Sequence, residues 1–160
     1  MEIEKSCKTT KSQMSKLYRE TYLNSYRVIV TGSCEFIDYD LMCCELDKLF
    51  WVSAEFEEKE IKIISGMGVG ADTLAIRYAD ERELTKILFP ANWKSYHRIA
   101  GILRNEDMLS VATHLVVFEY GESNDTCHMI EIAKAKGIPI WSLKYHTAEA
   151  EQQICLERLS

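Results

Sequence analysis

The chain contains the run Ile61-Lys62-Ile63-Ile64-Ser65-Gly66-Met67-Gly68-Val69-Gly70-Ala71-Asp72, and this run decides the fold. Its first four residues are mostly apolar and β-branched, which is typical of a buried strand. The glycines that follow predict a tight loop, because glycine adopts backbone conformations that other residues avoid. Leu74, Ala75 and Tyr78 then recur at helical spacing, so a helix is expected from about Ala71. A strand, a loop and a helix in this order form half of a βαβ unit.

The same alternation of strand and helix continues on both sides of this unit. Strands are expected at residues 27–30, 61–64, 86–89, 114–118 and 138–141. Helices are expected after a cap at Asp38 or Asp40, from about Ala71, over residues 102–112, before Gly137 and over residues 148–159. This rhythm predicts a single Rossmann-like α/β domain of three layers, with a five-stranded parallel sheet in the order 3-2-1-4-5.

Residues 1–24 differ from the rest of the chain in being polar, with only weak helical spacing. We expect them to form an N-terminal extension with room for one helix. Residues 25–160 are expected to form the Rossmann-like domain, because no linker, internal repeat or low-complexity tract divides them.

The composition is that of an ordinary globular protein, with a net charge of −6 and a pI near 5.3. An acidic chain lacks the basic surface that duplex DNA or an anionic membrane requires, so neither duplex nucleic acid nor a membrane is expected as a partner. A nucleotide-like small molecule is compatible with this charge, because a few oriented amides and one or two cations bind an anion. No apolar run reaches the roughly 18 residues of a membrane span, and residues 1–15 do not resemble a secretory signal, so a cytoplasmic location is expected.

The cysteines and histidines form no recognisable ligand pattern. The six cysteines include no C-x-x-C pair, and the four histidines are not spaced with them as zinc ligands are. We therefore expect no metal, no cofactor and no disulfide framework, with the thiols reduced.

Three glycine-bearing loops each follow a strand and precede a helix. They are Thr31-Gly32-Ser33, the segment from Gly66 to Asp72, and the segment from Gly121 to Thr126. In the expected strand order, the strands before these loops are neighbours. Ligands of open parallel sheets bind beyond the carboxyl ends of the strands, where the strand order reverses. The three loops are therefore expected to meet over one crevice.

The second loop has two interpretations. Gly66, Gly68 and Gly70 either bring the backbone close to a ligand at a helix N-terminus or only permit a tight turn, Gly68 by adopting a positive φ. Their spacing is neither the G-x-G-x-x-G dinucleotide motif nor a P-loop, which disfavours an NAD dehydrogenase and an ordinary ATPase. Asp72 either caps the helix or accepts hydrogen bonds from ribose hydroxyls, and Ser33 either donates to a phosphate or caps its turn.

Four further residues have a functional and a structural interpretation. Asn105 falls on the apolar stripe of its helix, so it either ties down a loop carbonyl or faces the crevice. Arg104 is either an anion partner or a solvated surface residue. Trp93 and Tyr96 follow Pro90 at the end of a strand, where they either stack on a base or belong to the core.

Five short motifs follow one another along the chain: Arg27-Val28-Ile29-Val30-Thr31-Gly32-Ser33, Ser65-Gly66-x-Gly68-x-Gly70-Ala71-Asp72, Phe89-Pro90-x-x-Trp93-Lys94, Arg104-Asn105-x-x-Met108 and Gly121-x-Ser123-x-x-Thr126. Together they resemble the SLOG superfamily, in particular its small stand-alone members, over about residues 26–142. The resemblance implies the Rossmann-like fold that SLOG proteins share with DNA-processing protein A and the lonely-guy phosphoribohydrolases. It also implies binding of a nucleotide or a nucleotide-derived signal, for some members as sensors in phage-defence conflicts.

Three positions depart from this pattern. Similar proteins carry arginine at the position of Cys34 and glycine at the position of Asp125, so this chain loses a cation and gains a carboxylate. Both changes disfavour a ligand with several phosphates. The phosphoribohydrolases rely on a glutamate three residues after the loop threonine, where this chain has Met129. Their mechanism is therefore not carried over, and the expectation leans away from an enzyme.

The expected function is binding of a nucleotide or nucleotide-derived ligand at the carboxyl ends of the parallel strands. The expected ligand-binding residues are Thr31, Gly32, Ser33, Gly66, Gly68, Gly70, Ala71, Asp72, Trp93, Lys94, Arg104, Asn105, Gly121, Ser123 and Thr126. One alternative is a hydrolase or transferase of nucleotide N-glycosidic bonds, with Asp38, Asp72 or Glu119 as acid, base or nucleophile. The other alternative is an oligomeric scaffold without a ligand, and the choice between monomer and homo-oligomer is left open.

Overall fold

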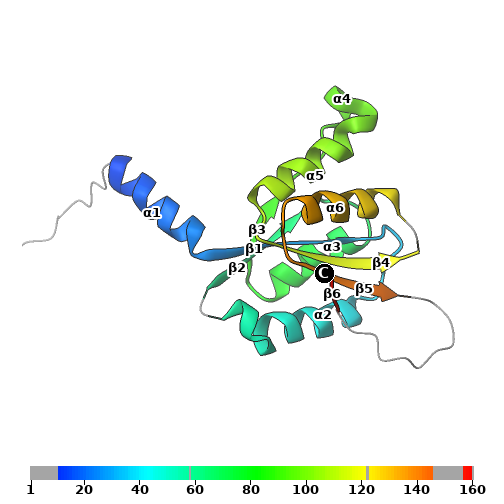
Figure 1. The fold of residues 1–160 in the computed structure, drawn as a ribbon, viewed down its shortest axis with the longest axis horizontal. Coiled ribbons are helices and arrows are strands. Elements are labelled where there is room, and N and C mark those ends of the chain that lie inside the picture. The colour runs from blue at the N-terminus through cyan, green and yellow to red at the C-terminus, as the bar shows by residue number, and fades with distance from the viewer. Residues whose placement is uncertain (1–10, 58, 122, 146–156, 160) are drawn as a thin grey trace, which may run out of the picture.

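The computed structural model describes residues 11–57, 59–121, 123–145 and 157–159. The centre of the described chain is a six-stranded sheet (Figure 1). Its strands are β1 (Ser25–Gly32), β2 (Glu60–Ser65), β3 (Thr85–Leu88), β4 (His114–Tyr120), β5 (Ile140–Tyr145) and β6 (Glu157–Leu159). Their order is β3-β2-β1-β4-β5-β6, and β1 to β5 all pair in parallel. The predicted fold class and the predicted order 3-2-1-4-5 are confirmed, with a sixth strand added at one edge.

Helices cover both faces of the sheet, as the predicted three layers require. The helices α2 (Tyr39–Asp47) and α3 (Ala71–Glu81) pack on one face, while α5 (Ala100–Val111) and α6 (Asn124–Ala135) pack on the other. Shorter helical segments are η1 (Lys48–Val52), η2 (Ala54–Phe56), α4 (Trp93–Tyr96) and η3 (His97–Ile99). In Figure 1, α5 runs from the sheet to α4, which stands above the rest of the domain.

The core is divided between the two faces, because successive residues of a strand point to opposite sides. In β1, Val28 and Val30 pack toward α2 and α3, and Ile29 packs toward α5 and α6. All three side chains are fully buried, as is normal for parallel strands that are covered on both faces. Because both faces are filled with core side chains, the strand ends are where a site has room.

The end of the chain differs from the sequence-based expectation. Residues 148–159 were expected to form an amphipathic helix, but residues 157–159 form β6, which pairs antiparallel with β5. The rest of that segment lies outside the described residues. The physical reason is that the outer edge of β5 presents unpaired backbone groups, which a further strand satisfies. The guanidinium of Arg158 also lies 5.4 Å from the ring centroid of Trp141, which favours this pairing.

The helix α1 (Lys11–Leu23) lies before β1 and extends away from the domain (Figure 1). Its Leu17 and Tyr18 side chains are exposed. The division into an extension of residues 1–24 and a domain of residues 25–160 stays a prediction. Within the described ranges, no helix combines the length and the apolar character that crossing a bilayer demands.

Candidate functional site

The loops after β1, β2 and β4 leave the sheet at the same edge. The strand β1 lies between β2 and β4 and is parallel to both, so their carboxyl ends point the same way. At the end of β1, a Cβ on Gly32 would lie 2.0 Å from the carbonyl oxygen of Phe118. Glycine is therefore required where β1 and β4 approach each other, and the Ser33 amide donates to the same oxygen over 3.0 Å. The loops meet as the predicted strand order requires.

A pocket of about 270 Å³ lies between these loops, and we call it the arginine pocket. Its lining combines residues from all three loops with residues from α4 and α5. The predicted site residues among them are Thr31, Gly32, Gly68, Asp72, Trp93, Arg104, Asn105, Ser123 and Thr126. The remaining lining residues are Cys34, Val69, Asp125 and Met129.

Asp72 joins two of the loops. It is 4% exposed, and its carboxylate accepts hydrogen bonds from the Thr31 hydroxyl over 2.6 Å and from the Gly68 amide over 3.2 Å. The hydroxyl of Ser65 donates to the main-chain oxygen of Asp72 over 3.0 Å. Gly70, not Asp72, is the N-cap of α3, and it makes no side-chain bond there. Asp72 therefore does not cap α3, although it is the acidic residue of the first turn, where it complements the helix dipole. Its carboxylate is engaged with the loops after β1 and β2.

The glycines of the second loop serve different purposes. Gly70 has a φ of +82°, and a Cβ on it would lie 2.4 Å from the main-chain oxygen of Ser33. A Cβ on Gly66 would lie 2.9 Å from Nε of Arg104. Gly68 has no positive φ, and a Cβ there would meet the Asp72 carboxylate at 3.1 Å. The interpretation that Gly68 turns the chain at positive φ is therefore wrong, since the turn falls on Gly70.

Arg104 is held beneath the second loop. One of its terminal nitrogens donates to the main-chain oxygen of Gly66 over 3.0 Å, and the other to the side-chain oxygen of Asn105 over 3.4 Å. Its Nε is buried and has no hydrogen-bond partner among the described residues. Asn105 is 3% exposed and lines the pocket. The solvated-surface interpretation of Arg104 is therefore wrong, and Asn105 faces the crevice.

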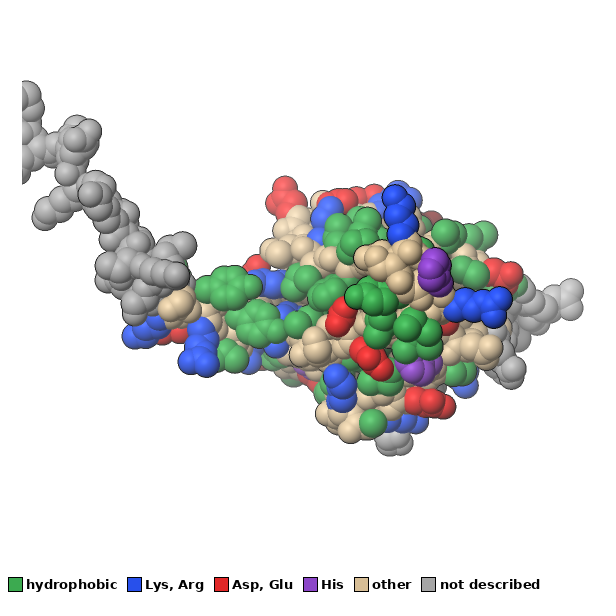
Figure 2. Space-filling model, turned by 90° about the horizontal axis from the view of Figure 1, so that it is seen from above, with side chains coloured by type: hydrophobic (Ala, Val, Ile, Leu, Met, Phe, Trp, Pro, Cys, Tyr) green, Lys and Arg blue, Asp and Glu red, His purple; other side chains and the backbone are tan. Residues whose placement is uncertain are grey.

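Trp93 and Tyr96 lie outside the core. They are 58% and 51% exposed, because α4 starts beyond the end of β3, where the Asn92 side chain accepts a hydrogen bond from the Ser95 amide. Trp93 lines the arginine pocket, whereas Tyr96 and Lys94 line neither of the two pockets described here. Figure 2, which looks down on the side where α4 stands, shows hydrophobic side chains exposed among charged ones. The core interpretation of the two aromatic residues is wrong.

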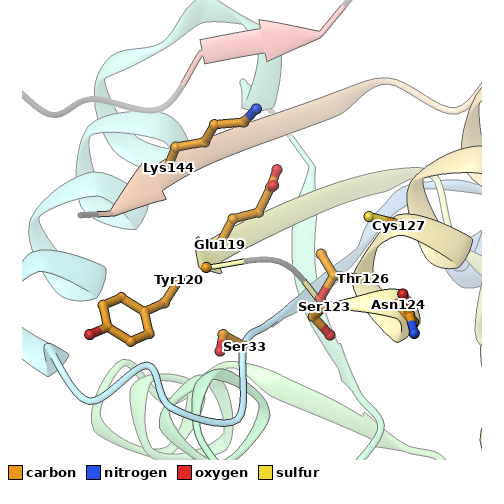
Figure 3. Close-up of a pocket in the computed structure, with 9 residues that line it drawn as sticks. Ser33, Glu119, Tyr120, Ser123, Asn124, Thr126, Cys127 and Lys144 are labelled. Carbon is orange, nitrogen blue, oxygen red and sulfur yellow. The ribbon is translucent and has the colours of Figure 1, made fainter. Parts of the chain in front are cut away.

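A second pocket, of about 560 Å³, adjoins the first, and we call it the lysine pocket (Figure 3). Its described lining residues are Ser33, Glu119, Tyr120, Gly121, Ser123, Asn124, Thr126, Cys127 and Lys144. Ser123 and Thr126 therefore line both pockets. Sequence reasoning missed Lys144, because the fifth strand was expected to end at Trp141, whereas β5 continues to Tyr145.

The three candidate catalytic carboxylates do not converge. Asp38 is the N-cap of α2, accepting from the Leu41 amide over 2.9 Å, and it lines neither pocket. Asp72 lines the arginine pocket and Glu119 lines the lysine pocket, where it accepts a hydrogen bond from Ser142.

Three of the remaining predicted residues line neither pocket. Ala71 and Gly66 are buried behind the loop, and neither they nor Gly70 line either pocket. Met129 does line the arginine pocket. The position at which the phosphoribohydrolases carry glutamate thus faces the arginine pocket, and here it has only a thioether.

The fold and the position of the two pockets define a Rossmann-like domain with two pockets at the carboxyl ends of its parallel strands. The family model described as "YspA, cpYpsA-related SLOG family" matches residues 26–96. The resemblance to the SLOG superfamily that was inferred from the motifs is therefore confirmed over residues 26–96.

Three individual proteins are similar to this chain. The Gene 61 protein of Mycobacterium phage D29 is 28% identical over 124 residues, which cover 71% of this chain and 93% of the phage protein. DNA processing protein A from Streptococcus pneumoniae shares the fold with a TM-score of 0.59 and 13% identity, over 81% of this chain and 54% of that protein. DNA processing protein A from Helicobacter pylori gives a TM-score of 0.54 and 10% identity, over 82% of this chain and 71% of that protein. The chain thus spans about half the length of the Streptococcus protein.

These similarities correct one expectation about partners. Because the chain is acidic, no duplex nucleic acid was expected as a partner. The Helicobacter pylori protein has a single-stranded DNA binding mode. A nucleic acid partner is therefore not excluded for this fold by net charge, and the expectation is wrong, because binding depends on the local charges of a crevice.

Proposed function

We propose that the arginine pocket binds a nucleotide, either free or as part of a single strand. The observation that carries the proposal is that a fixed cation and an exposed aromatic ring line the same small pocket, Arg104 and Trp93. A guanidinium binds a phosphate through charge-assisted hydrogen bonds, and an indole stacks on a base. The hydroxyls of Ser123 and Thr126 and the amide of Asn105 supply neutral polar partners for the sugar and the phosphate.

The charges of the pocket favour a ligand with a single phosphate. Among its described lining residues, Arg104 is the one cation, and Asp72 and Asp125 are carboxylates. A triphosphate would bring about three or more negative charges into this pocket, where the two carboxylates repel them and a single guanidinium attracts them. Each additional phosphate is therefore expected to weaken binding.

We propose binding without turnover, as a sensor of a nucleotide signal needs. A hydrolase of N-glycosidic bonds needs an acid and a base at one bond. Among the described residues that line the arginine pocket, two are carboxylates, Asp72 and Asp125. Both oxygens of Asp72 accept hydrogen bonds, from Thr31 and Gly68, so this carboxylate is engaged in joining the loops and Asp125 is left without a second free carboxylate. The neighbouring Met129 cannot replace it. Incubation of the protein with 5′-AMP, followed by chromatography for free adenine, is expected to return intact nucleotide.

Isothermal titration calorimetry with 5′-AMP and 5′-dAMP tests the proposal. Arg104→Ala is expected to weaken binding by about 10- to 100-fold, the effect of losing a hydrogen bond to a charged group. Lys134→Ala, which removes an exposed lysine in the last turn of α6, is the control and should bind like the wild type. An unchanged dissociation constant for Arg104→Ala, or equal loss in both variants, would contradict the proposal.

A further inference from the structure

The two pockets form a pair with a shared wall at the start of α6. Ser123, the N-cap of that helix, and Thr126 in its first turn line both of them. Sites for drug-sized ligands usually have about 300–1,000 Å³. The arginine pocket, at about 270 Å³, is slightly below this range, while the lysine pocket has about 560 Å³. A ligand of ordinary size therefore has room to extend from the first pocket into the second.

Both pockets contain the same kinds of side chain. The arginine pocket has one cation and one aromatic ring on its wall, Arg104 and Trp93, and the lysine pocket has Lys144 and Tyr120. In Figure 3, Tyr120 and Ser33 lie on one side of the lysine pocket, and Ser123 and Thr126 lie on the other. Proteins that bind single strands use the same combination, with a positively charged groove along the backbone and aromatic rings on which successive bases stack.

We propose that the paired pockets bind two nucleotide units joined by a phosphodiester, one unit in each pocket. This inference rests on the proposed nucleotide binding in the arginine pocket and adds the second unit. The hydroxyls of Ser123 and Thr126 lie on the shared wall, where the linkage between the units passes. Hydroxyl groups donate hydrogen bonds to phosphate oxygens without adding charge, which suits a linkage of one negative charge.

The distribution of charge supports separated phosphates over a polyphosphate chain. Each pocket has one cation among its described lining residues, and each also has carboxylates: Asp72 and Asp125 in one, Glu119 in the other. A polyphosphate would concentrate its charge beside a single cation and against these carboxylates. Two nucleotide units instead place one phosphate near each cation, and carboxylates accept hydrogen bonds from base amino groups.

Calorimetric titration of the full chain with pdApdA, 5′-dAMP and dADP tests this inference. We expect pdApdA to bind at least about tenfold more tightly than 5′-dAMP, because the second unit binds within one molecule. We expect dADP to bind no more tightly than 5′-dAMP. Lys144→Ala should abolish the advantage of pdApdA and weaken the binding of 5′-dAMP much less than that of pdApdA. The matched control is Lys134→Ala, which should preserve that advantage.

The outcomes separate the inference from the proposed function. If 5′-dAMP binds and pdApdA gains nothing, or if Lys144→Ala weakens both equally, the second unit is refuted and mononucleotide binding stands. If none of the three probes binds, the proposed function itself fails. A longer deoxyadenylate strand distinguishes the two sources of a dinucleotide unit. Binding as tight as that of pdApdA indicates a single strand, whereas weaker binding indicates a free dinucleotide.

Discussion

Alanine substitutions at Gly70 and Gly68, two residues apart in one loop, are expected to differ sharply in their cost. At Gly70 the φ of +82° is unfavourable for any residue with a side chain, and a Cβ would lie 2.4 Å from the backbone oxygen of Ser33. Strained backbone costs about 1–3 kcal/mol, and overpacking against a rigid neighbour costs about as much again. We therefore expect Gly70→Ala to lose about 4 kcal/mol of the free energy of unfolding.

Gly68→Ala has no backbone strain to overcome, and its steric penalty is smaller than that of Gly70→Ala. Its φ is not positive, and the nearest atom to a Cβ is a side-chain oxygen of Asp72 at 3.1 Å, which must yield slightly. A loss of about 1 kcal/mol is expected. In the same variant, binding of 5′-AMP should weaken, because Gly68 lines the arginine pocket and a methyl group there occupies ligand space.

Thermal unfolding followed by circular dichroism measures the difference. A protein of this size shifts its Tm by about 2–4 °C for each kcal/mol. Gly70→Ala is therefore expected to lower the Tm by roughly 8–16 °C, and Gly68→Ala by about 2–4 °C. Equal shifts, or a larger shift for Gly68→Ala, would refute the assignment of the turn to Gly70.

Two further predictions concern Asp72, whose carboxylate is the tether between the loops after β1 and β2, and the buried His114. Asp72→Ala should cost about 3 kcal/mol in chemical denaturation, because two hydrogen bonds to a buried carboxylate are lost. Asp72→Asn should cost less than half of that, since an amide can still accept from Gly68 and donate to Thr31, and equal costs would contradict the tether. Burial lowers the pKa of His114, so the unfolded chain binds its proton more readily than the folded chain. This contribution to stability is present above about pH 6.5 and is lost as the pH falls below it. The free energy of unfolding of His114→Gln should therefore fall less between about pH 7.5 and 5.5 than that of the wild type. An unchanged dependence of the unfolding free energy on pH would contradict this prediction.

The sheet could be predicted from the sequence because its signals are local. Residues 27–30, 61–64 and 114–118 are short apolar runs between turn residues, and glycine loops follow all three strands. Right-handed crossovers then leave few possible strand orders. The same signals placed Thr31, Gly68 and Thr126 at one edge, and the structure brings them into one pocket.

Other features depend on contacts between distant residues. Lys144 belongs to the lysine pocket because pairing with β4 extends β5 past Trp141, which no local pattern indicates. The carboxylate of Asp72 bonds to Thr31, 41 residues earlier in the chain, so its role as a tether has no signal in its own loop. The identity of the turning glycine likewise depends on how closely Ser33 approaches Gly70.

The central claim is that a nucleotide binds where the loops after β1, β2 and β4 meet, and amide chemical shifts test it most directly. Uniformly ¹⁵N-labelled protein would be titrated with 5′-AMP, and the backbone resonances followed by two-dimensional NMR. We expect the largest shifts at Gly32, Gly68, Val69 and Thr126, which line the arginine pocket. The amides at the opposite edge, at the start of β1 and β2, should stay unchanged. Shifts concentrated at that opposite edge, or no shifts at saturating nucleotide, would contradict the claim.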